Sequence, residues 1–497
     1  MRKLVYILLL FSLSIAVNAT SFRRDWFLLY NGGDSVDRQH NDSIIAYRAN
    51  PGLAIGEMSP DMSIIKPINP DFKWLVYVSA EDNYVPRTCY PDTAEYHYLL
   101  TMADDSGWSR EIFYCHYQDT TIVTLGGDSV IMPAYAYAQT QQDSVDARCY
   151  IYYSDRSRVL KNYSNQHSRE AHVAYLKYYL NQPSSGGYYH DGIFGDNGSY
   201  HLWNTGTLLK GGHIYEAGGL RVDSVGITPS DWWWQSNLKP FYQAVHDTFA
   251  NAANWATDGK PKYYGPNIDG TWTYEYVDSG VADYLFPEYE YSTFRDHSGS
   301  LDTYSYDSAA TINGVSICWM STDDNSAAGF TVDYHEHVRG NVCLFYLTRY
   351  GLNDSAMFYQ FGRSHPDASD WDSMNWCGAM DFNVGNCLDT KYSAVQTGTD
   401  PLGQAYTLYK RQYQNALILM RPRGNYGESI DTVATKITYN LGGNYQEILP
   451  EGDTGAVVTS TTFWNGQGKI MILSGGAPAP TTHKKHTGKI YIKKGKL

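Results

Sequence analysis

The stretch Gly187-Tyr188-Tyr189-His190-Asp191-Gly192-Ile193-Phe194-Gly195-Asp196-Asn197 decides the fold class of this 497-residue chain. Its apolar centre lies between glycines and ends on an acidic residue, which predicts a buried strand with a carboxylate at its end. Helical patterns lie on both sides of it, from about Arg169 and after Ser230. Their apolar residues recur at helical spacing: Val173, Leu176 and Leu180 in the first, and Leu238, Phe241, Val245, Phe249 and Ala252 in the second. A strand between two helices predicts a βα-type fold.

The same alternation of short strands and helices runs outward from this stretch, from Asp25 to about Gln360. The predicted strands are 26–30, 74–78, 158–163, 188–197, 262–265, 281–286, 315–319 and 356–360, and Val338, Val342 and Phe345 mark a further helix. Eight strands with helices between them predict an α/β fold, a (β/α)₈ TIM barrel over 20–370.

Two segments interrupt this alternation, and a different pattern follows it. Residues 84–157 are a β-rich insertion with a hairpin turn at Gly126-Gly127-Asp128, and 197–229 form a long Gly-rich loop. From 371 to 474 the sequence predicts strands at 416–420, 435–439 and 469–473, with turns at 440–444 and 465–468. We therefore expect a C-terminal all-β sandwich domain. Residues 475–497 form a basic tail, either a sorting signal or a frayed end.

The first residues have the three parts of a secretory signal peptide. Arg2 and Lys3 precede an apolar run from Leu4 to Val17, and a small-residue cleavage site ends at Ala19. The run is too short for a membrane span, so we expect no integral membrane segment. The prediction is a secreted protein, extracellular or at the cell surface, and the alternative is an uncleaved amphipathic N-terminus.

The bulk composition excludes several classes of partner. A formal net charge of −14 argues against nucleic acid, which binds basic surfaces. Seven cysteines are too few for a disulfide scaffold, and Cys318 and Cys343 lie in apolar segments, as buried thiols do. His335 and His337 lack the spacing of a zinc motif, so we predict neither a metal nor a cofactor. The sequence leaves the oligomeric state open.

Acidic residues at strand ends are the candidates for chemistry, because barrel active sites lie at the carboxyl ends of the strands. Asp196 ends the fourth predicted strand, and Asp191 lies five positions earlier, on the opposite face of a regular strand. Glu288 and Glu290 follow the sixth strand and share a face. Two carboxyl groups across one site are what hydrolysis of a glycosidic bond requires. The alternatives are a structural role for Asp191 and a solvated loop for the glutamates.

Aromatic and amide side chains near these acids are candidates for binding a sugar, by stacking and by hydrogen bonds to hydroxyls. The predicted substrate-binding residues are Asn162, Asn197, Trp232, Trp233, Tyr264, Asn267, Tyr289, Trp319 and Gln360. Three consecutive tryptophans, Trp232 to Trp234, cannot all face a core from a regular helix, so we expect at least one to be exposed. The alternative for most of these aromatic residues is ordinary core packing.

The segment 187–197 resembles the G-[YF]-D-G-[IV]-F-L-D-N strand of glycoside hydrolase barrels, namely the hypothetical glycosyl hydrolase family fifteen and the related endo-polygalactosaminidase-like barrels. It departs from them where Tyr189-His190 precede Asp191 and where Gly195 replaces Leu. Residues 283–288 are similar to the family's sixth-strand D-x-x-x-x-E, and 410–422 to the strand that opens its β-domain. The resemblance implies a TIM barrel, an extracellular polysaccharide substrate, and a strand-four aspartate with a strand-six glutamate as catalysts.

These observations predict a secreted glycoside hydrolase that acts on a polysaccharide or oligosaccharide by a two-carboxylate mechanism. In it Asp196 is the nucleophile or base, Glu288 the general acid, and Glu290 the substitute for Glu288. One alternative is a non-catalytic carbohydrate-binding protein on the same scaffold. Another is a polysaccharide lyase with Tyr189 or His190 as its base.

Overall fold

The computed structural model describes residues 26–29, 51–56, 62–67, 69–80, 82–84, 94–117, 121–125, 128–132, 148–149, 158–183, 187–196, 198, 214–215, 232–255, 258–268, 274–291, 297–322, 334–350, 356–361, 377–424 and 427–474. The predicted signal peptide, most of the Gly-rich loop and the basic tail lie outside these ranges. The chain divides into two compact units. The first comprises 1–288, 309–319 and 354–359, and the second comprises 289–308, 320–353 and 360–497.

A parallel sheet is the centre of the first unit. Its strands are β1 (Trp26–Leu29), β2 (Pro51–Gly56), β3 (Lys73–Ser79), β9 (Gly192–Asp196), β11 (Tyr263–Pro266), β12 (Tyr284–Leu285), β14 (Ser316–Thr322) and β15 (Ala356–Phe361). They are ordered β11-β9-β3-β2-β1-β15-β14-β12, and β13 (Glu288–Tyr291) pairs with β14 off this path. Adjacent strands on the path are therefore successive strands of the path along the chain, except β1 and β15, which are the first and last along the chain.

The two strands at the ends of this path, β11 and β12, are hydrogen-bonded to each other. Asp283 N donates to Tyr264 O at 2.9 Å, and Phe286 N donates to Pro266 O at 3.1 Å. Asn267 and Phe286 form a parallel bridge just beyond the two strands. These bonds join the first and last strands of the path through the residues at both ends of β11.

One predicted strand is wrong, and one observed strand was not predicted. The third, 158–163, is wrong as a strand of the parallel sheet, because β8 (Arg158–Leu160) pairs antiparallel with β4 (Asp82–Tyr84). Its place is taken by β2, which the sequence analysis missed and whose Leu53, Ala54 and Ile55 are fully buried. So short an apolar run, opened by a proline, gives no alternating pattern to detect.

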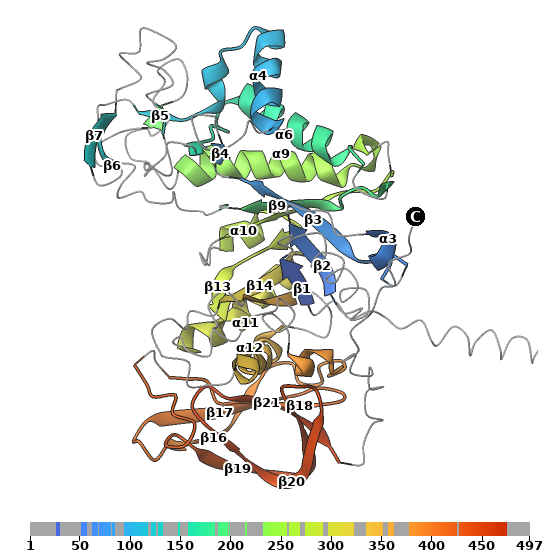
Figure 1. Ribbon diagram of the computed structural model, residues 1–497, viewed down its shortest axis with the longest axis vertical. Coiled ribbons are helices and arrows are strands. Elements are labelled where there is room, and N and C mark those ends of the chain that lie inside the picture. The colour runs from blue at the N-terminus through green and yellow to red at the C-terminus, as the bar shows by residue number, and fades with distance from the viewer. Residues whose placement is uncertain are drawn as a thin grey trace, which may run out of the picture. The chain divides into compact units, whose positions relative to one another are not determined.

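Two helices cover one face of β3 and β9 (Figure 1). Helix α6 (Gln166–Leu180) begins at Asn165, whose side chain accepts the N–H groups of His167 and Ser168. Helix α9 spans Lys239–Ala250. The four predicted core residues Leu238, Phe241, Val245 and Phe249 are buried, while Ala252 is exposed because it follows the end of α9. The face of the sheet under α6 and α9 is called the helix-packed face below.

All three consecutive tryptophans are buried, with Trp232 2% exposed and Trp233 and Trp234 0% exposed. The expectation that one of them is exposed is therefore wrong. The segment Trp233–Leu238 is a π-helix, whose turns are wider than those of an α-helix. The Trp234 ring packs against Tyr276, with ring centroids 4.5 Å apart. A wide turn with neighbours on several sides can bury three adjacent rings.

The insertion between β3 and α6 contains the predicted hairpin, with β6 (Thr121–Leu125) antiparallel to β7 (Asp128–Met132). It also contains helix α4 (Ala94–Ser106), so it is not purely β. A buried ion cluster lies in it, with Glu111 Oε1 2.6 Å from Arg148 Nη2 and Glu111 Oε2 2.9 Å from His116 Nε2. Burial alone would raise the pKa of Glu111, but these hydrogen bonds hold it at about 2.

The second unit holds a six-stranded antiparallel sheet, ordered β16-β17-β18-β21-β19-β20. The strands are β16 (Ser393–Thr399), β17 (Ala405–Gln412), β18 (Leu417–Met420), β19 (Ile437–Ile448), β20 (Thr454–Phe463) and β21 (Gly468–Leu473). The predicted sandwich is corrected to this one sheet, which curls (Figure 1), since the described residues of 377–474 contribute no second sheet. The turn predicted at 440–444 is also wrong. Those residues lie inside β19, where the register with β20 shifts between Asn440 and Tyr445.

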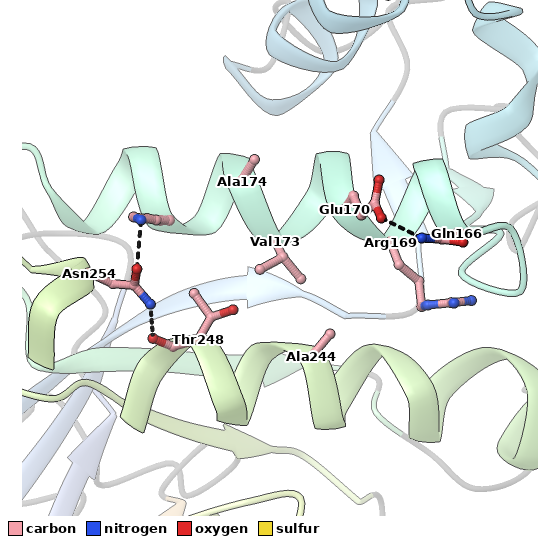
Figure 2. Close-up of a pocket in the computed structure, with 9 residues that line it drawn as sticks. Gln166, Arg169, Glu170, Val173, Ala174, Ala244, Thr248 and Asn254 are labelled. Carbon is pink, nitrogen blue, oxygen red and sulfur yellow. Dashed lines mark hydrogen bonds between the residues drawn. The ribbon is translucent and has the colours of Figure 1, made fainter. Parts of the chain in front are cut away.

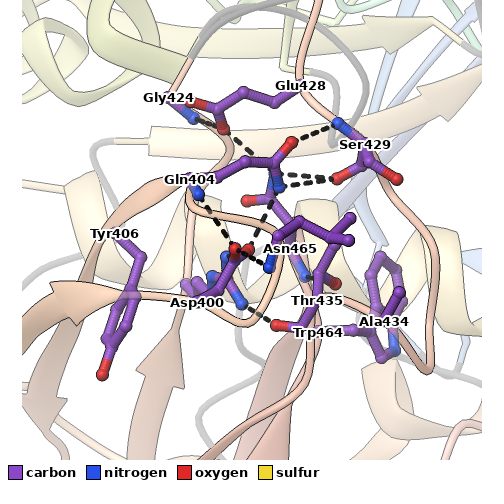
Figure 3. Close-up of polar contacts among 12 residues, drawn as sticks. Asp400, Gln404, Tyr406, Gly424, Glu428, Ser429, Ala434, Thr435, Trp464 and Asn465 are labelled. Atoms are coloured by element: carbon purple, nitrogen blue, oxygen red, sulfur yellow. Dashed lines mark hydrogen bonds and ion pairs between the residues drawn. The ribbon is translucent and has the colours of Figure 1, made fainter.

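Buried polar groups fix the loops at one end of this sheet (Figure 3). Arg421 Nη2 lies 2.6 Å from Asp400 Oδ2, and both side chains are 0% exposed. Gln404 donates to the same oxygen at 3.1 Å and accepts from Ser429 N at 2.6 Å. Helix α12 (Tyr334–Thr348), which was predicted from its apolar spacing, packs on β18 and β21. These groups bind one another and the backbone, so we assign them to stability.

Candidate active site

The face of the sheet opposite the helix-packed face carries a line of aromatic rings. The Phe194 ring centroid lies 5.6 Å from that of Tyr77 and 5.0 Å from that of Phe286. Gly265 makes room for this line, because a Cβ there would lie 2.4 Å from the Phe286 ring. We call this the Phe194 face. Side chains alternate along a strand, so residues two positions from these rings share the face.

Asp196 is the last residue of β9 and lies two positions beyond Phe194, on the Phe194 face. Asn267 Nδ2 donates to Asp196 Oδ1 at 2.9 Å, and the Tyr77 hydroxyl donates to Asp196 Oδ2. These donors come from the two strands that flank β9. The carboxylate predicted as the nucleophile or base is therefore held from both sides at the carboxyl end of the sheet.

Asp191 has a different role, at the start of the same strand. Asp191 N donates to Trp74 O at 2.9 Å, and Trp74 N donates to Asp191 Oδ2 at 2.9 Å. The Lys66 ammonium lies 3.6 Å from the same carboxylate. These contacts favour the structural alternative for Asp191 over the predicted catalytic role, because its carboxylate is bound to backbone at the amino end of the strand.

Asp283 repeats this arrangement before β12. Asp283 N donates to Tyr264 O at 2.9 Å, and Tyr264 N donates to Asp283 Oδ2 at 2.8 Å. Burial raises the pKa of Asp283 in spite of this hydrogen bond from Tyr264. The chain thus uses one device twice, an aspartate that clamps the first residues of the neighbouring strand.

The two clamps relate Asp196 to Glu288. Asp196 follows its clamp, Asp191, by five residues, and Glu288 follows Asp283 by the same number. Phe286 is on the Phe194 face, and Glu288 follows it by two positions in the sequence, at the start of the separate strand β13. The structure describes the backbone of Glu288, Tyr289 and Glu290 in β13, but their side chains lie outside the described residues.

Gly195 explains one departure from the strand that the sequence resembles. A Cβ on Gly195 would lie 2.6 Å from the Tyr264 hydroxyl and 3.2 Å from Ala80 Cβ. The larger Leu of the family strand would collide with Tyr264, which points between β9 and α9 toward Tyr242. The glycine is therefore a packing requirement of the helix-packed face and is not a change at the catalytic position.

Five of the predicted sugar-binding residues are corrected to packing or backbone-binding roles. Trp232, Trp233, Tyr264 and Trp319 are each at most 2% exposed, so none presents a ring face to a ligand. Asn162 is 1% exposed, and its side-chain oxygen accepts from Ser164 Oγ at 2.6 Å. Asn267 remains a candidate site residue, because its side chain donates a hydrogen bond to Asp196. Asn197 and the side chains of Tyr289 and Gln360 lie outside the described residues.

His190, one of the two residues named as a base for the lyase alternative, lies at the other end of the strand from Asp196. It lies before β9, with its ring centroid 3.8 Å from that of Trp74. Burial lowers the pKa of His190 to about 4. A buried imidazole at the amino end of the strand cannot serve chemistry at the carboxyl end, which disfavours His190 as a base.

A buried cluster supports the end of β3, beside Asp196. Lys161 is 1% exposed and donates from Nζ to Ser79 O at 2.7 Å and to Glu95 Oε1 at 2.9 Å. Ser79 pairs with Asp196 in the sheet register. Sequence reasoning missed this cluster, because Glu95 lies in the insertion and Lys161 follows it, and no local pattern predicts that they meet at β3.

The described cavities lie away from the Phe194 face. A groove of about 500 Å³ lies between α6 and α9, and its lining residues are helical or adjacent to helices (Figure 2). A second cavity, of about 10 Å³, is lined by Leu176, Phe241 and Tyr264 and others on the helix-packed side. Neither contains Asp196, and the smaller could hold at most a single water molecule.

The described residues hold no group of three or more His, Cys, Asp or Glu side chains that could bind a metal ion. Within the same ranges, none of the helices has the length and apolar character needed to cross a membrane.

No family model and no curated protein matches the chain. Several solved structures align with most of the chain at low identity. A family GH13_31 enzyme aligns with a TM-score of 0.46 at 9% identity, over 91% of this chain and 99% of its own. The cyclic alpha-maltosyl-(1→6)-maltose hydrolase of Arthrobacter globiformis aligns with a TM-score of 0.43 at 10% identity, over 90% and 97%. The first belongs to a different family from the one that the sequence resembles. The case for a function therefore rests on the chain's own residues.

Proposed function

We propose that this chain is an exported glycoside hydrolase whose catalytic carboxylates are Asp196 and Glu288. The observation that carries the proposal is the position of Asp196 at the carboxyl end of β9, held by Tyr77 and Asn267. The two donors, a tyrosine hydroxyl and a side-chain amide, hold the carboxylate in the position that a nucleophile or base requires.

The proposal includes a closed (β/α)₈ barrel, with the Phe194 face inside it. The strand order follows the chain, and the hydrogen bonds between β11 and β12 support closure. The helices α6 and α9 lie on the helix-packed face, as the outer helices of a barrel do. In such a barrel the active site forms where the strands end, which is where Asp196 lies.

The strand order also supports Glu288 as the partner of Asp196. Strand β11 pairs with β9 and is hydrogen-bonded to the residues that flank β12. Two strand spacings of about 4.8 Å, roughly 10 Å in all, therefore separate the backbone of β9 from that of β12, which precedes Glu288. Side chains that point toward a common axis bring their carboxyl groups closer than that. This range includes both the roughly 5–5.5 Å of retaining enzymes and the roughly 6.5–9.5 Å of inverting ones.

Each residue then has a distinct role. Glu288 donates a proton to the glycosidic oxygen as the bond to the leaving sugar breaks. Asp196 attacks the anomeric carbon or removes a proton from the attacking water. Tyr77 and Asn267 hold the Asp196 carboxylate in one orientation, which reduces the entropy lost on reaching the transition state.

The test is reducing-end release by the purified chain across plant, algal and microbial polysaccharides, beside Asp196→Asn. Asp191→Asn is the matched control, since it makes the same change at the other end of the strand. Release by wild type and by Asp191→Asn, with none by Asp196→Asn, is the expected result. Binding to a polymer without release by any of the three would favour a non-catalytic carbohydrate-binding protein instead.

A further inference from the structure

The insertion brings two cysteines, 34 positions apart in sequence, onto adjacent strands. His116 and Arg148 form an antiparallel bridge. The next residues along this register are Cys115 and Cys149, so the two cysteines lie directly opposite each other. Cys149 N donates to Cys115 O at 2.8 Å, which confirms the pairing of the two residues.

A closed circuit of backbone hydrogen bonds fixes this pair. Cys149 N donates to Cys115 O at 2.8 Å, Cys115 N donates to Leu160 O at 3.0 Å, and Leu160 N donates to Cys149 O at 2.8 Å. Opposed residues of an antiparallel pair have Cα atoms about 4.5–5.5 Å apart. Disulfides bridge Cα atoms about 4.4–6.8 Å apart. The backbone separation is therefore one that a disulfide spans.

The side chains share one buried environment. Directly opposed residues point to the same face of an antiparallel pair. Cys115 is 0% exposed and Cys149 is 1% exposed, and both are thiols in this structure. His116 and Arg148 occupy the alternate positions next to the two cysteines, so these two side chains, which bind Glu111 of the preceding 3-10 helix, point to the other face. Burial raises the pKa of the Cys149 thiol well above its ordinary value.

We propose that Cys115 and Cys149 form a disulfide in the exported protein. The two thiols lose two protons and two electrons as the sulfur–sulfur bond forms, and a disulfide of the exporting compartment, carried by a thiol oxidoreductase or by glutathione, is reduced to two thiols. The bond forms before the insertion is fully folded, because buried thiols with a raised pKa react slowly. The disulfide proposal rests on the export of the protein, which is part of the proposed function, and does not rest on hydrolase activity.

The experiment is peptide mapping of the full chain after production with its own leader in an oxidising secretory compartment. The protein is denatured with N-ethylmaleimide present and digested without reductant. We expect a linked peptide pair that contains Cys115 and Cys149, which separates on reduction. Alkylation of both cysteines before reduction, or a peptide that links either of them to Cys89, would overturn the proposal.

A second experiment tests whether the two cysteines can form a disulfide, independently of whether the protein is exported. The chain is refolded in a buffer of reduced and oxidised glutathione, and its Tm is measured with and without a strong reductant. We expect the reductant to lower the Tm of wild type by several degrees and to leave the Tm of Cys115→Ser/Cys149→Ser unchanged. Cys318→Ser, which alters another fully buried cysteine, should behave as wild type. A linked pair that forms only on refolding, and not in the exported protein, would contradict the proposal as stated.

Discussion

Asp191 and Asp196 lie at the two ends of one strand, yet the structure binds them in opposite ways. Asp191 exchanges hydrogen bonds with the backbone of Trp74, so its carboxylate belongs to the architecture of the sheet. Asp196 is bound by two side chains, Tyr77 and Asn267, on the Phe194 face. The difference shows that one strand carries a structural carboxylate at its start and the proposed reactive carboxylate at its end. Four predictions test this separation, from the largest expected effect to the smallest.

The largest effect is expected from Asp196→Asn. Loss of the nucleophile or base should reduce kcat by about 10³-fold or more, because the amide neither attacks nor accepts a proton. The Tm should change little, since an amide oxygen still accepts from Asn267. Reducing-end assays and thermal unfolding on the same preparation measure both quantities. Retention of more than a tenth of the activity would remove Asp196 from the mechanism.

Asp191→Ala should show the converse behaviour. It leaves the Trp74 N–H without its side-chain acceptor, which costs about 1–3 kcal/mol of stability. Asp283→Ala should act in the same way through Tyr264 N, and kcat per folded molecule should stay within a few-fold in both variants. Chemical denaturation checks the stability, and Asp191→Asn is the control that keeps an acceptor. A loss of kcat in Asp191→Ala without a loss of stability would contradict the structural role assigned to Asp191.

Tyr77→Phe sharpens the contrast further, because it removes one donor to Asp196 and leaves the ring on the Phe194 face. A hydrogen bond to a charged group contributes about 1.5–3 kcal/mol, so a loss of roughly 10- to 100-fold in kcat is expected. Ser79→Ala, which changes a neighbouring side chain of the same strand, serves as the comparison. Equal effects of both variants on kcat would show that the Tyr77 hydroxyl is not specific.

The smallest effect concerns pH and the second clamp. Burial raises the pKa of Asp283, so the folded state binds its proton more tightly than the unfolded state does. Stability from this group is therefore fully present below the unfolded pKa of about 4 and is lost as the pH rises through the folded value. Wild type should become slightly more stable relative to Asp283→Asn, by less than about 1 kcal/mol, as the pH falls from 7 to 5. The opposite trend would contradict the assignment.

The sequence predicted the parts of the site that depend on local pattern. Glycines and apolar residues around Ile193-Phe194 located β9, and strand alternation separated Asp191 from Asp196. It did not predict β2, whose buried run of Leu53, Ala54 and Ile55 is too short to show a period. Alternation alone also did not predict that Asp191 binds the backbone of Trp74 in the neighbouring strand.

The aromatic residues show the other limit of the sequence. A tyrosine or tryptophan has the same pattern in sequence whether its ring meets a ligand or a helix. Tyr264 lies against Tyr242 of α9, with ring centroids 5.2 Å apart, and Trp234 lies against Tyr276. The contacts that bury them join segments 22 and 42 residues apart, which no local window detects. Tyr77 and Lys161 were missed for the same reason.

The clamps at Asp191 and Asp283 also bear on how such a sheet can change over time. A slip of one residue would turn every side chain of a strand to the other face. Each clamp binds both backbone groups of a single residue, Trp74 or Tyr264, and so specifies alignment at the first residues of the strand. Strand alignment then does not depend on the last residues of the strand. We therefore expect substitutions at positions 196 and 288 to change the chemistry without changing the alignment of the sheet.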